Sequence, residues 1–181
     1  LDCFVCTNCP FSENRSNVVF GSGNPKAEVM FIGEGPGEQE DLQAKPFVGR
    51  SGKLLDSMLG EIGLSREKNI YIGNIVKCRP PKNRDPLPEE QDLCIDWLRN
   101  QMAILKPKII VTVGRIAAMK IIDPNIKITK DHGTFYENKK ALMMPTIHPA
   151  AILRNSKHKP LVEDDFRKLK LKIEEVCAHT Y

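Results

Sequence analysis

The hydrophobic positions of this chain fall into four short apolar runs, which are separated by longer segments with a helical repeat of apolar residues. Each run is rich in Ile, Val and Met, which is typical of strands buried on both faces of a sheet. Strands are therefore expected at residues 28–32, 70–76, 108–113 and 141–147. The fourth run contains Pro145, which cannot donate a backbone hydrogen bond and fits a central strand less well.

The segments between the runs carry apolar residues three or four positions apart, which predicts amphipathic helices. In residues 53–62 these side chains share one face: Leu54, Leu55, Met58, Leu59 and Ile62. Further helices are predicted over residues 88–105, 115–122 and 163–176. Pro88 suits a first helical turn, where its missing N–H has no helical acceptor.

The alternation of strands and helices predicts an α/β fold with three layers, in which a central four-stranded parallel twisted sheet is flanked by helices. With 181 residues, 41% of them hydrophobic, the chain is expected to form a single domain over residues 1–181. Such sheets bind ligands at the carboxyl ends of their strands. The loops of interest therefore begin at Gly33, Asn74, Gly114 and His148.

Five of the six cysteines are split between the N-terminus and a distant pair: Cys3, Cys6 and Cys9, then Cys78 and Cys94. A C-x-x-C pair places two thiolates on one turn, and the fold must bring in the distant pair to complete a metal site. Such a site ties the N-terminal segment to the body of the domain. Disulfides or unlinked thiols are the alternative, and four cysteines suit either zinc or iron. The long gaps resemble no common zinc ribbon and favour iron and sulfur.

The net charge of +4 permits an anionic partner without demanding one. The basic residues gather in two loops: Lys77, Arg79, Lys82 and Arg84, and then Arg154, Lys157, His158 and Lys159. These loops suggest a phosphate-binding face, although two solvated loops explain the charge equally well. No signal peptide and no apolar run of membrane-spanning length are present, so we expect a cytoplasmic protein with no membrane partner.

The loop that begins at Gly33 holds three glycines around a proline, and these let the backbone pass close to a ligand beside Glu34. It is not a dinucleotide fingerprint, because the third glycine falls one residue early and no helical pattern opens there. Residues 49–53 are not a phosphate loop either, because Phe47 stands where the leading glycine is needed.

Asn74 ends a buried strand, and its carboxamide can read the edge of a base, although a strand-end hydrogen bond is an equally good interpretation. In the last loop, Pro149 holds His148 extended, and Ile152 and Leu153 are expected to lie in an exposed turn beside Arg154. An exposed apolar tip next to a cation is typical of proteins that wedge into a base stack while holding phosphates.

Several of these segments, taken together, resemble the iron-sulfur (family four) uracil-DNA glycosylases of bacteria and archaea. The resemblance covers nearly the whole chain and is carried by Cys6-Thr-Asn-Cys9 with Cys78 and Cys94, by residues 33–41 leading to 45–50, by 74–81 and by 148–154. It implies a 4Fe-4S cluster on Cys6, Cys9, Cys78 and Cys94. It also implies a partner, uracil-containing DNA, and a monomeric repair enzyme that acts in the cytoplasm near the nucleoid.

The resemblance gives roles to single residues. Phe47 stacks on the extruded uracil, Asn74 pairs with O4 and N3–H of the uracil, and His148 lies near O2 as a neutral donor. Glu34 positions the water that attacks the sugar C1′. The remaining implied contacts are Gly33 and Gly35 near O2, Glu40 near C5, and a DNA-binding set formed by Arg79, Lys82, Arg84, Ile152, Leu153 and Arg154.

Some patterns separate this chain from related groups. Gly35 and Gly37 stand where family-one enzymes carry an Asp that activates the water and a Tyr that blocks thymine, so this chain lacks both side chains. The role of Glu34 as the catalytic carboxylate is what the family resemblance implies. Residues 42–47 hold no basic insertion of the kind found in a covalent-binding group, so turnover is expected. No motif places a lysine for Schiff-base chemistry, so we do not expect the protein to cleave the DNA strand.

Two other functions remain open on these residues. One is a non-catalytic iron-sulfur module that binds DNA and senses oxidants, and the other is a zinc-bearing glycosylase. Cys3 completes C-x-x-C-x-x-C and could replace Cys6 or Cys9 as a ligand, whereas Cys177 is interpreted as a structural or free thiol.

Overall fold

Six strands form one mixed sheet in the order β1-β3-β2-β4-β6-β5 in the computed structural model, which describes residues 2–181. The strands are β1 (Ser22–Gly23), β2 (Val29–Gly33), β3 (Ile70–Asn74), β4 (Ile109–Val113), β5 (Tyr136–Glu137) and β6 (Leu142–Thr146). The four longer strands run parallel to one another, and the two short edge strands are antiparallel to their neighbours.

The mixed sheet differs from the expected four-stranded parallel sheet only at its edges. The four predicted strands are present within a few residues of their expected bounds. The edge strands β1 and β5 are two residues long and half-buried or exposed, so no apolar run marks them in the sequence.

The helices are α1 (Glu38–Gln43), α2 (Arg50–Glu61), α3 (Pro88–Leu105), α4 (Arg115–Ile121), α5 (Ile128–Asp131), α6 (Pro149–Arg154) and α7 (Lys159–Val176). Four short 3-10 helices accompany them: η1 (Asp2–Val5), η2 (Pro10–Glu13), η3 (Pro81–Asn83) and η4 (Ser156–His158). The predicted absence of a helix after the glycine-rich loop is wrong, because α1 begins at Glu38. At six residues, α1 is too short to show an amphipathic repeat.

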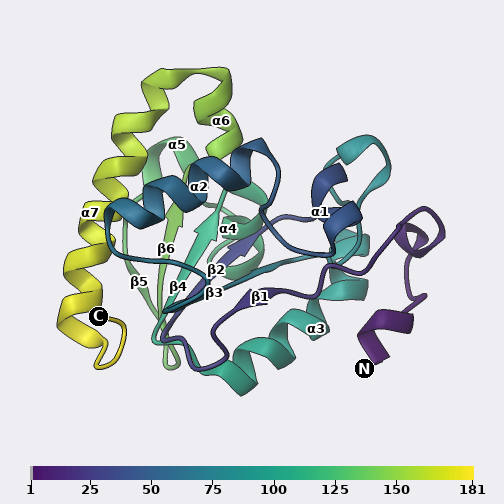
Figure 1. The fold of residues 1–181 in the computed structure, drawn as a ribbon, viewed down its shortest axis with the longest axis horizontal. Helices are drawn as coiled ribbons and strands as arrows, with labels where there is room; N and C mark the ends of the chain where they lie inside the picture. The colour runs from purple at the N-terminus through teal and green to yellow at the C-terminus, as the bar shows by residue number, and fades with distance from the viewer. Residues whose placement is uncertain (1) are drawn as a thin grey trace.

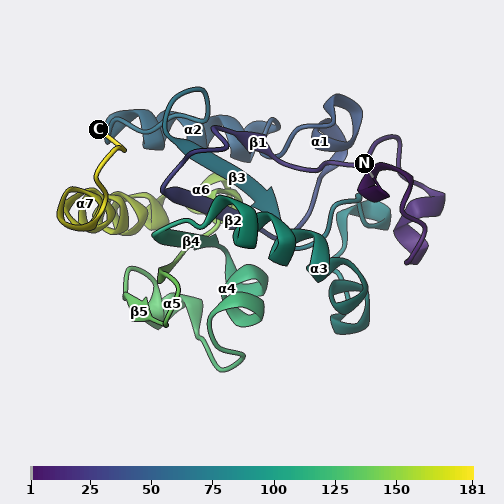
Figure 2. The same cartoon turned by 90° about the horizontal axis from the view of Figure 1, so that it is seen from below.

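The two faces of the sheet bury separate hydrophobic clusters because neighbouring side chains of a strand point to opposite faces. Val29 and Phe31 of β2 belong to a cluster with α2, α6 and α7, whereas Met30 and Ile32 pack with residues of α3 and α4. Figures 1 and 2 show the resulting layers, with α2 on one side of the sheet and α4 on the other.

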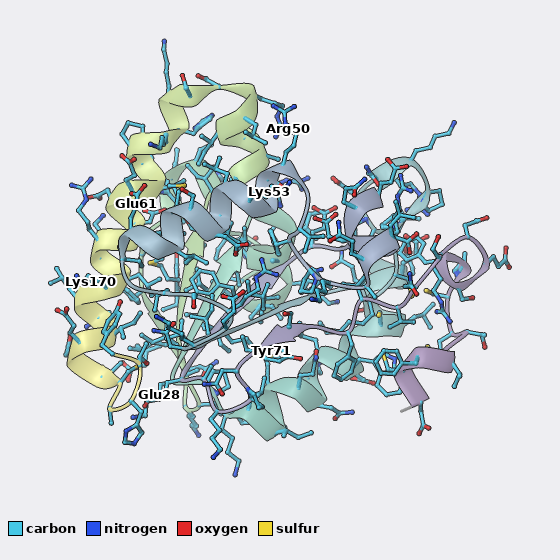
Figure 3. All side chains as sticks on the ribbon, viewed as in Figure 1. Glu28, Arg50, Lys53, Glu61, Tyr71 and Lys170 are labelled. Atoms are coloured by element: carbon cyan, nitrogen blue, oxygen red, sulfur yellow. The ribbon has the colours of Figure 1, made fainter. Side chains whose placement is uncertain are left out.

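The N-terminal and C-terminal segments lie on opposite sides of the molecule (Figure 1). A carboxylate holds each of them by hydrogen bonds to backbone N–H groups. The Asp41 carboxylate accepts hydrogen bonds from the backbone N–H groups of Ser16 (2.9 Å) and Asn17 (3.1 Å), which holds the N-terminal segment against α1. Glu28, labelled in Figure 3, accepts from the N–H groups of Ala178 and His179 near the C-terminus. Within residues 2–181, no helix has the length and apolar character needed to cross a membrane.

Candidate active site

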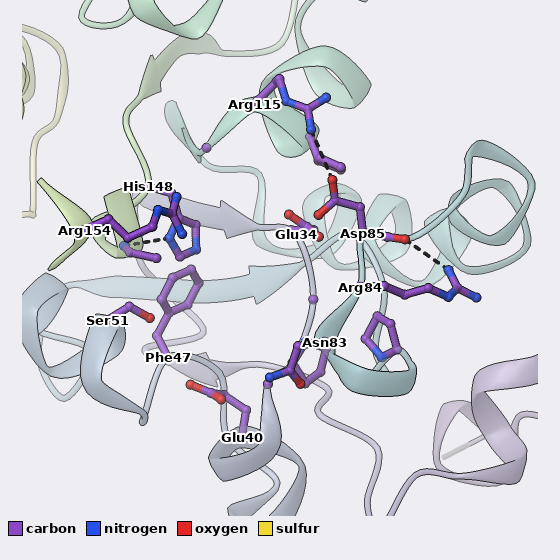
Figure 4. Close-up of a pocket in the computed structure, with 17 residues that line it drawn as sticks. Glu34, Glu40, Phe47, Ser51, Asn83, Arg84, Asp85, Arg115, His148 and Arg154 are labelled. Carbon is purple, nitrogen blue, oxygen red and sulfur yellow. Dashed lines mark hydrogen bonds and ion pairs between the residues drawn. The ribbon is translucent and has the colours of Figure 1, made fainter. Parts of the chain in front are cut away.

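A cavity of about 610 Å³ opens at the carboxyl end of the parallel strands, where the sequence places its candidate loops. It is lined by loop residues that follow β2 and β6, by the segment before α3 and by the start of α4 (Figure 4). Seven of the predicted site residues line it: Glu34, Gly35, Glu40, Phe47, Arg84, His148 and Arg154. Gly33 and Asn74 lie next to the cavity rather than on its surface, as described below.

His148 is held as a neutral imidazole. It caps α6, and its Nδ1 accepts a hydrogen bond from the backbone N–H of Ala150 at 3.0 Å. Because a backbone N–H can only donate, Nδ1 carries no proton and the ring proton lies on Nε2. Burial and, to a smaller extent, the charge of Arg154 lower the pKa of His148 to about 4, although Glu40 opposes the shift. The ring is therefore a neutral hydrogen-bond donor at physiological pH.

Phe47 packs beside this imidazole, with the two ring centroids 5.8 Å apart and the planes at 30°. Its backbone has a φ of 52°, a left-handed conformation that is uncommon for a bulky residue. Gly52 at the start of α2 permits it, because a Cβ there would lie 2.1 Å from the Phe47 carbonyl. A residue held in such a sparsely populated conformation is typical of ligand-binding sites.

Asn74 is buried next to Phe47 and Gly33. A Cβ atom at Gly33 would lie 2.5 Å from Phe47 Cζ and 2.6 Å from Asn74 Oδ1, so only glycine fits between them. The Asn74 side chain is 2% exposed, and its Oδ1 has no hydrogen-bond partner among the described residues. An unpaired buried amide oxygen costs about 1–3 kcal/mol, so this atom is an acceptor that awaits a donor.

Glu34 lies beside a second carboxylate, Asp85, on the same wall of the cavity (Figure 4). Arg115 forms an ion pair with Asp85, with an N–O distance of 3.1 Å. Burial, together with the charge of Asp85 and a hydrogen bond with it, raises the pKa of Glu34 to about 7. Arg115 acts in the opposite direction. Glu34 is thus poised to exchange a proton near neutral pH, as a general base must be.

Glu40 forms a rigid part of the wall. Its Oε1 accepts hydrogen bonds from the backbone N–H groups of Val48 (3.0 Å) and Gly49 (2.9 Å). A Cβ atom at Gly37 would lie 2.9 Å from its other oxygen. The carboxylate thereby shapes the chain that carries Phe47.

The basic loops meet only in part at the cavity. Arg84 and Arg154 line it, whereas Arg79 and Lys82 lie outside, and the guanidinium of Arg84 already binds the Glu90 carboxylate at 2.8 and 2.6 Å. The expectation that Lys77 belongs to a phosphate-binding face is wrong: it is 1% exposed, and its ammonium donates to the Phe20 carbonyl oxygen.

The prediction of an exposed apolar tip is correct for Leu153 and wrong for Ile152. Leu153 is 45% exposed, but Ile152 is 6% exposed and packs into the core. The segment is the helix α6 rather than a turn, and its helical period directs Ile152 inward and Leu153 outward. Pro149 occupies the first helical position, where its fixed φ suits a helix as well as an extended turn.

Asp85, Arg115, Asn83 and Ser51 also line the cavity and were not predicted. Arg115 directly follows Gly114, where one of the four candidate loops begins, so its position was available from the topology. Asp85 carries no comparable signal, because it is an exposed carboxylate beside a basic loop.

Five cysteines line one small cavity at the N-terminal end of the molecule: Cys3, Cys6, Cys9, Cys78 and Cys94. All are free thiols, and no group of three or more His, Cys, Asp or Glu within residues 2–181 is placed to hold a single metal ion. Arg15 donates hydrogen bonds to the Cys6 carbonyl oxygen (2.7 Å) and to Cys78 Sγ (3.2 Å). Burial raises the pKa of the Cys94 thiol to about 12. The thiols converge from distant parts of the chain, as the spacing predicted.

The cavity at the sheet edge suits a planar, hydrogen-bonding ring, because an aromatic side chain, a neutral imidazole and a carboxyl group line it. A site of this kind is typical of α/β proteins that act on a nucleobase. The family model of the uracil DNA glycosylase superfamily matches residues 20–170. The chain therefore belongs to the uracil-DNA glycosylase superfamily.

Individual relatives carry a more specific name. The chain is 47% identical over 174 residues to a type-4 uracil-DNA glycosylase of Saccharolobus solfataricus, a match that covers 91% of this chain and 80% of the relative. Type-4 enzymes of Thermotoga maritima (45% identity; 91% and 88% covered) and Archaeoglobus fulgidus (44%; 91% and 86%) are similarly related. The resemblance noted in the sequence is thus confirmed.

Proposed function

We propose that this protein excises uracil from DNA by hydrolysing the N-glycosidic bond, and that it leaves an abasic site without cutting the strand. The observation that carries this proposal is the buried, unpaired oxygen of Asn74 beside Phe47 and the Nε2–H of His148. Uracil offers a matching edge, because its N3–H is a donor and its O4 and O2 are acceptors.

Asn74 selects the base. Uracil N3–H donates to Oδ1, and the Asn74 NH₂ group donates to O4. Cytosine presents an acceptor at N3 and a donor at its amino group, so both contacts are lost and the polar groups stay unpaired. Because Asn74 Oδ1 is inaccessible to solvent, the Phe47 ring moves away from Gly33 to admit the base and then stacks on it. The rigid Glu40 carboxylate lies near C5, where it excludes the methyl group of thymine.

His148 and Glu34 carry the chemistry. As the C1′–N1 bond breaks, its electron pair moves onto the uracil, and Nε2–H of the neutral His148 stabilises the negative charge at O2. The backbone N–H groups of residues 33–35 assist there. Glu34 accepts a proton from the water whose oxygen bonds to C1′, and its negative charge favours the positively charged sugar.

The DNA lies over the two basic loops. Arg79, Lys82 and Arg154 bind phosphates, and Leu153 enters the base stack. Arg84 contributes less to this surface, because its charge is already balanced by Glu90. Residues 1–181 act as one domain and as a monomer, on single- or double-stranded DNA, in the cytoplasm at the nucleoid.

Cys6, Cys9, Cys78 and Cys94 hold a 4Fe-4S cluster in this proposal. These four thiols line one small cavity, and four cysteine thiolates are the ligands that such a cluster takes. Cys6 and Cys9 would thereby be linked to Cys78, which precedes α3, and to Cys94 within α3, so the cluster would have a structural role. Arg15 stays beside Cys78 as a counter-charge.

Base release from defined oligonucleotides tests this function. The purified protein, with its iron and sulfide content measured, is incubated with strands that hold one uracil, cytosine or thymine, and then treated with alkali. We expect breakage only at uracil, and none before alkali. DNA binding that changes on oxidation, without any base release, would instead support the redox-sensing module.

A further inference from the structure

Three side chains from separate elements meet on one wall of the cavity (Figure 4). Glu34 follows β2, Asp85 precedes α3, and Arg115 is the first residue of α4. Arg115 Nη2 donates to Asp85 Oδ2 at 3.1 Å, and the Asp85 carboxylate lies within hydrogen-bonding reach of the Glu34 carboxyl group. The fold therefore aims a second carboxylate at the candidate base.

Asp85 and Arg115 contribute little to holding the fold together. Their side chains are 62% and 56% exposed, and ion pairs of this exposure add almost nothing to stability. Among the N–H groups of residues 2–181, only that of Arg115 donates to the Asp85 carboxylate, so no loop or helix end depends on it for a hydrogen bond. Their position needs a different explanation from that of buried carboxylates such as Asp41.

Two carboxyl groups in hydrogen-bonding contact share one proton, because ionising both places like charges side by side. The other charged or titratable groups around the cavity are Glu40 of α1, Arg84 beside Asp85, and His148 and Arg154 at the opposite wall. His148 is neutral, and Arg84 is paired with Glu90. Among the groups around Glu34, Asp85 raises its pKa and Arg115 lowers it.

We propose that Asp85, anchored by Arg115, is a positioning residue for Glu34: it orients the Glu34 carboxyl group toward the cavity and places a negative charge beside it. This rests on the proposed glycosylase function and on the role of Glu34 in it. In the free protein the pair holds one proton, which leaves to solvent before catalysis. The proton of the attacking water then passes to Glu34, while Asp85 remains paired with Arg115.

The test is the pH dependence of single-turnover base release, measured with the cluster-loaded protein in excess over a uracil-containing strand. For the wild type the rate rises with pH to a plateau, with a midpoint near 7. Asp85→Asn removes the neighbouring charge, so its midpoint falls by about one pH unit. Arg115→Gln moves the midpoint upward by a similar amount, and Asp85→Glu restores the wild-type midpoint.

Asp92→Asn is the matched control, because Asp92 is also an exposed aspartate paired with a cation, Lys120, but lies outside the cavity. It leaves the midpoint unchanged. An unchanged midpoint in both Asp85→Asn and Arg115→Gln, with base release intact, overturns the proposal and leaves the glycosylase function standing. Absence of base release by the wild type at every pH overturns the function itself. If thermal melting shows that Asp85→Asn does not fold, the Arg115→Gln variant tests the proposal alone. An upward shift of its midpoint supports the proposal, and an unchanged or lower midpoint overturns it.

Discussion

The polar groups on the two sides of the cavity differ in solvent exposure and in ionisation. On the wall proposed to recognise the base, His148 is held in its neutral form, and Asn74, 2% exposed, lies behind the cavity surface. On the carboxylate wall, Asp85 and Arg115 are more than half exposed and Glu34 titrates near neutral pH. Recognition of an uncharged ring needs fixed, dry donors and acceptors, whereas activating water needs a group that can exchange a proton.

The fold produces this difference directly. Asn74 ends β3, in the interior of the sheet, where it pairs in register with Gly33 of β2. Asp85 and Arg115 lie beyond the sheet, in the segments that precede α3 and begin α4. Substitutions on the first wall should change which base is released and how fast, whereas those on the second should change the pH at which release occurs.

The largest effect is expected at His148. Replacing it with alanine removes the donor to uracil O2, and losing one such donor slows the chemical step by about 10²- to 10³-fold. Single-turnover base release measures the loss, and DNA binding by fluorescence anisotropy should remain. His179→Ala is the control, because His179 is exposed near the C-terminus, at the end of the chain that Glu28 fastens. A His148→Ala protein that keeps its full rate contradicts the assigned role.

Glu34→Gln should slow release by about 10²-fold, the lower range for loss of a general base. The pH profile sharpens the result. Because Glu34 must be ionised and its pKa is raised to about 7, wild-type activity falls as the pH drops through 7. The Gln variant should lose this dependence. His148, with a pKa near 4, stays neutral throughout and adds no step between pH 5 and 9. A profile unchanged by Glu34→Gln would assign the ionisation to another group.

Asn74→Leu should slow uracil release by about 30- to 150-fold, because two hydrogen bonds of about 1–1.5 kcal/mol each are lost. Its melting temperature should equal or exceed that of the wild type, because an unpaired buried oxygen is replaced by an apolar group. Asn69→Leu is the matched opposite. The Asn69 side chain makes three hydrogen bonds to backbone groups, so this variant should melt earlier and keep its activity. A clear loss of stability in Asn74→Leu would show that the oxygen is satisfied in the free protein.

Long elements with strong local signals could be predicted from the sequence. Helix α3 spans Pro88–Leu105, as expected, because Pro88 fits its first turn and its apolar positions repeat over many residues. Helix α2 begins at Arg50, three residues before the predicted start, since Gly49, Ser51 and Gly52 give no helical signal. Short elements such as α1 and α6 were not predicted, because one or two turns cannot display a repeat.

The site was predictable where a residue ends a strand and unpredictable where it reaches in from outside. Glu34, Asn74 and His148 follow buried runs, and parallel topology brings such positions to one edge. Asp85 and Arg115 meet Glu34 only because the connections before α3 and after β4 happen to converge there. The burial of Asn74 Oδ1 and the tautomer of His148 depend on the coordinates of neighbouring atoms, which no spacing encodes.

The smallest effect on base release separates two neighbours on α6. Leu153→Ala removes a half-exposed side chain and should weaken DNA binding by about fivefold, equivalent to about 1 kcal/mol of apolar burial, with little change in melting temperature. Ile152→Ala should instead destabilise the protein by about 2–5 kcal/mol, because Ile152 is packed in the core, and leave the affinity of the folded protein unchanged. Anisotropy titrations and thermal melts on both variants separate the two roles. If Ile152→Ala weakens DNA binding more than Leu153→Ala without lowering stability, then α6 unfolds on the DNA and presents both side chains.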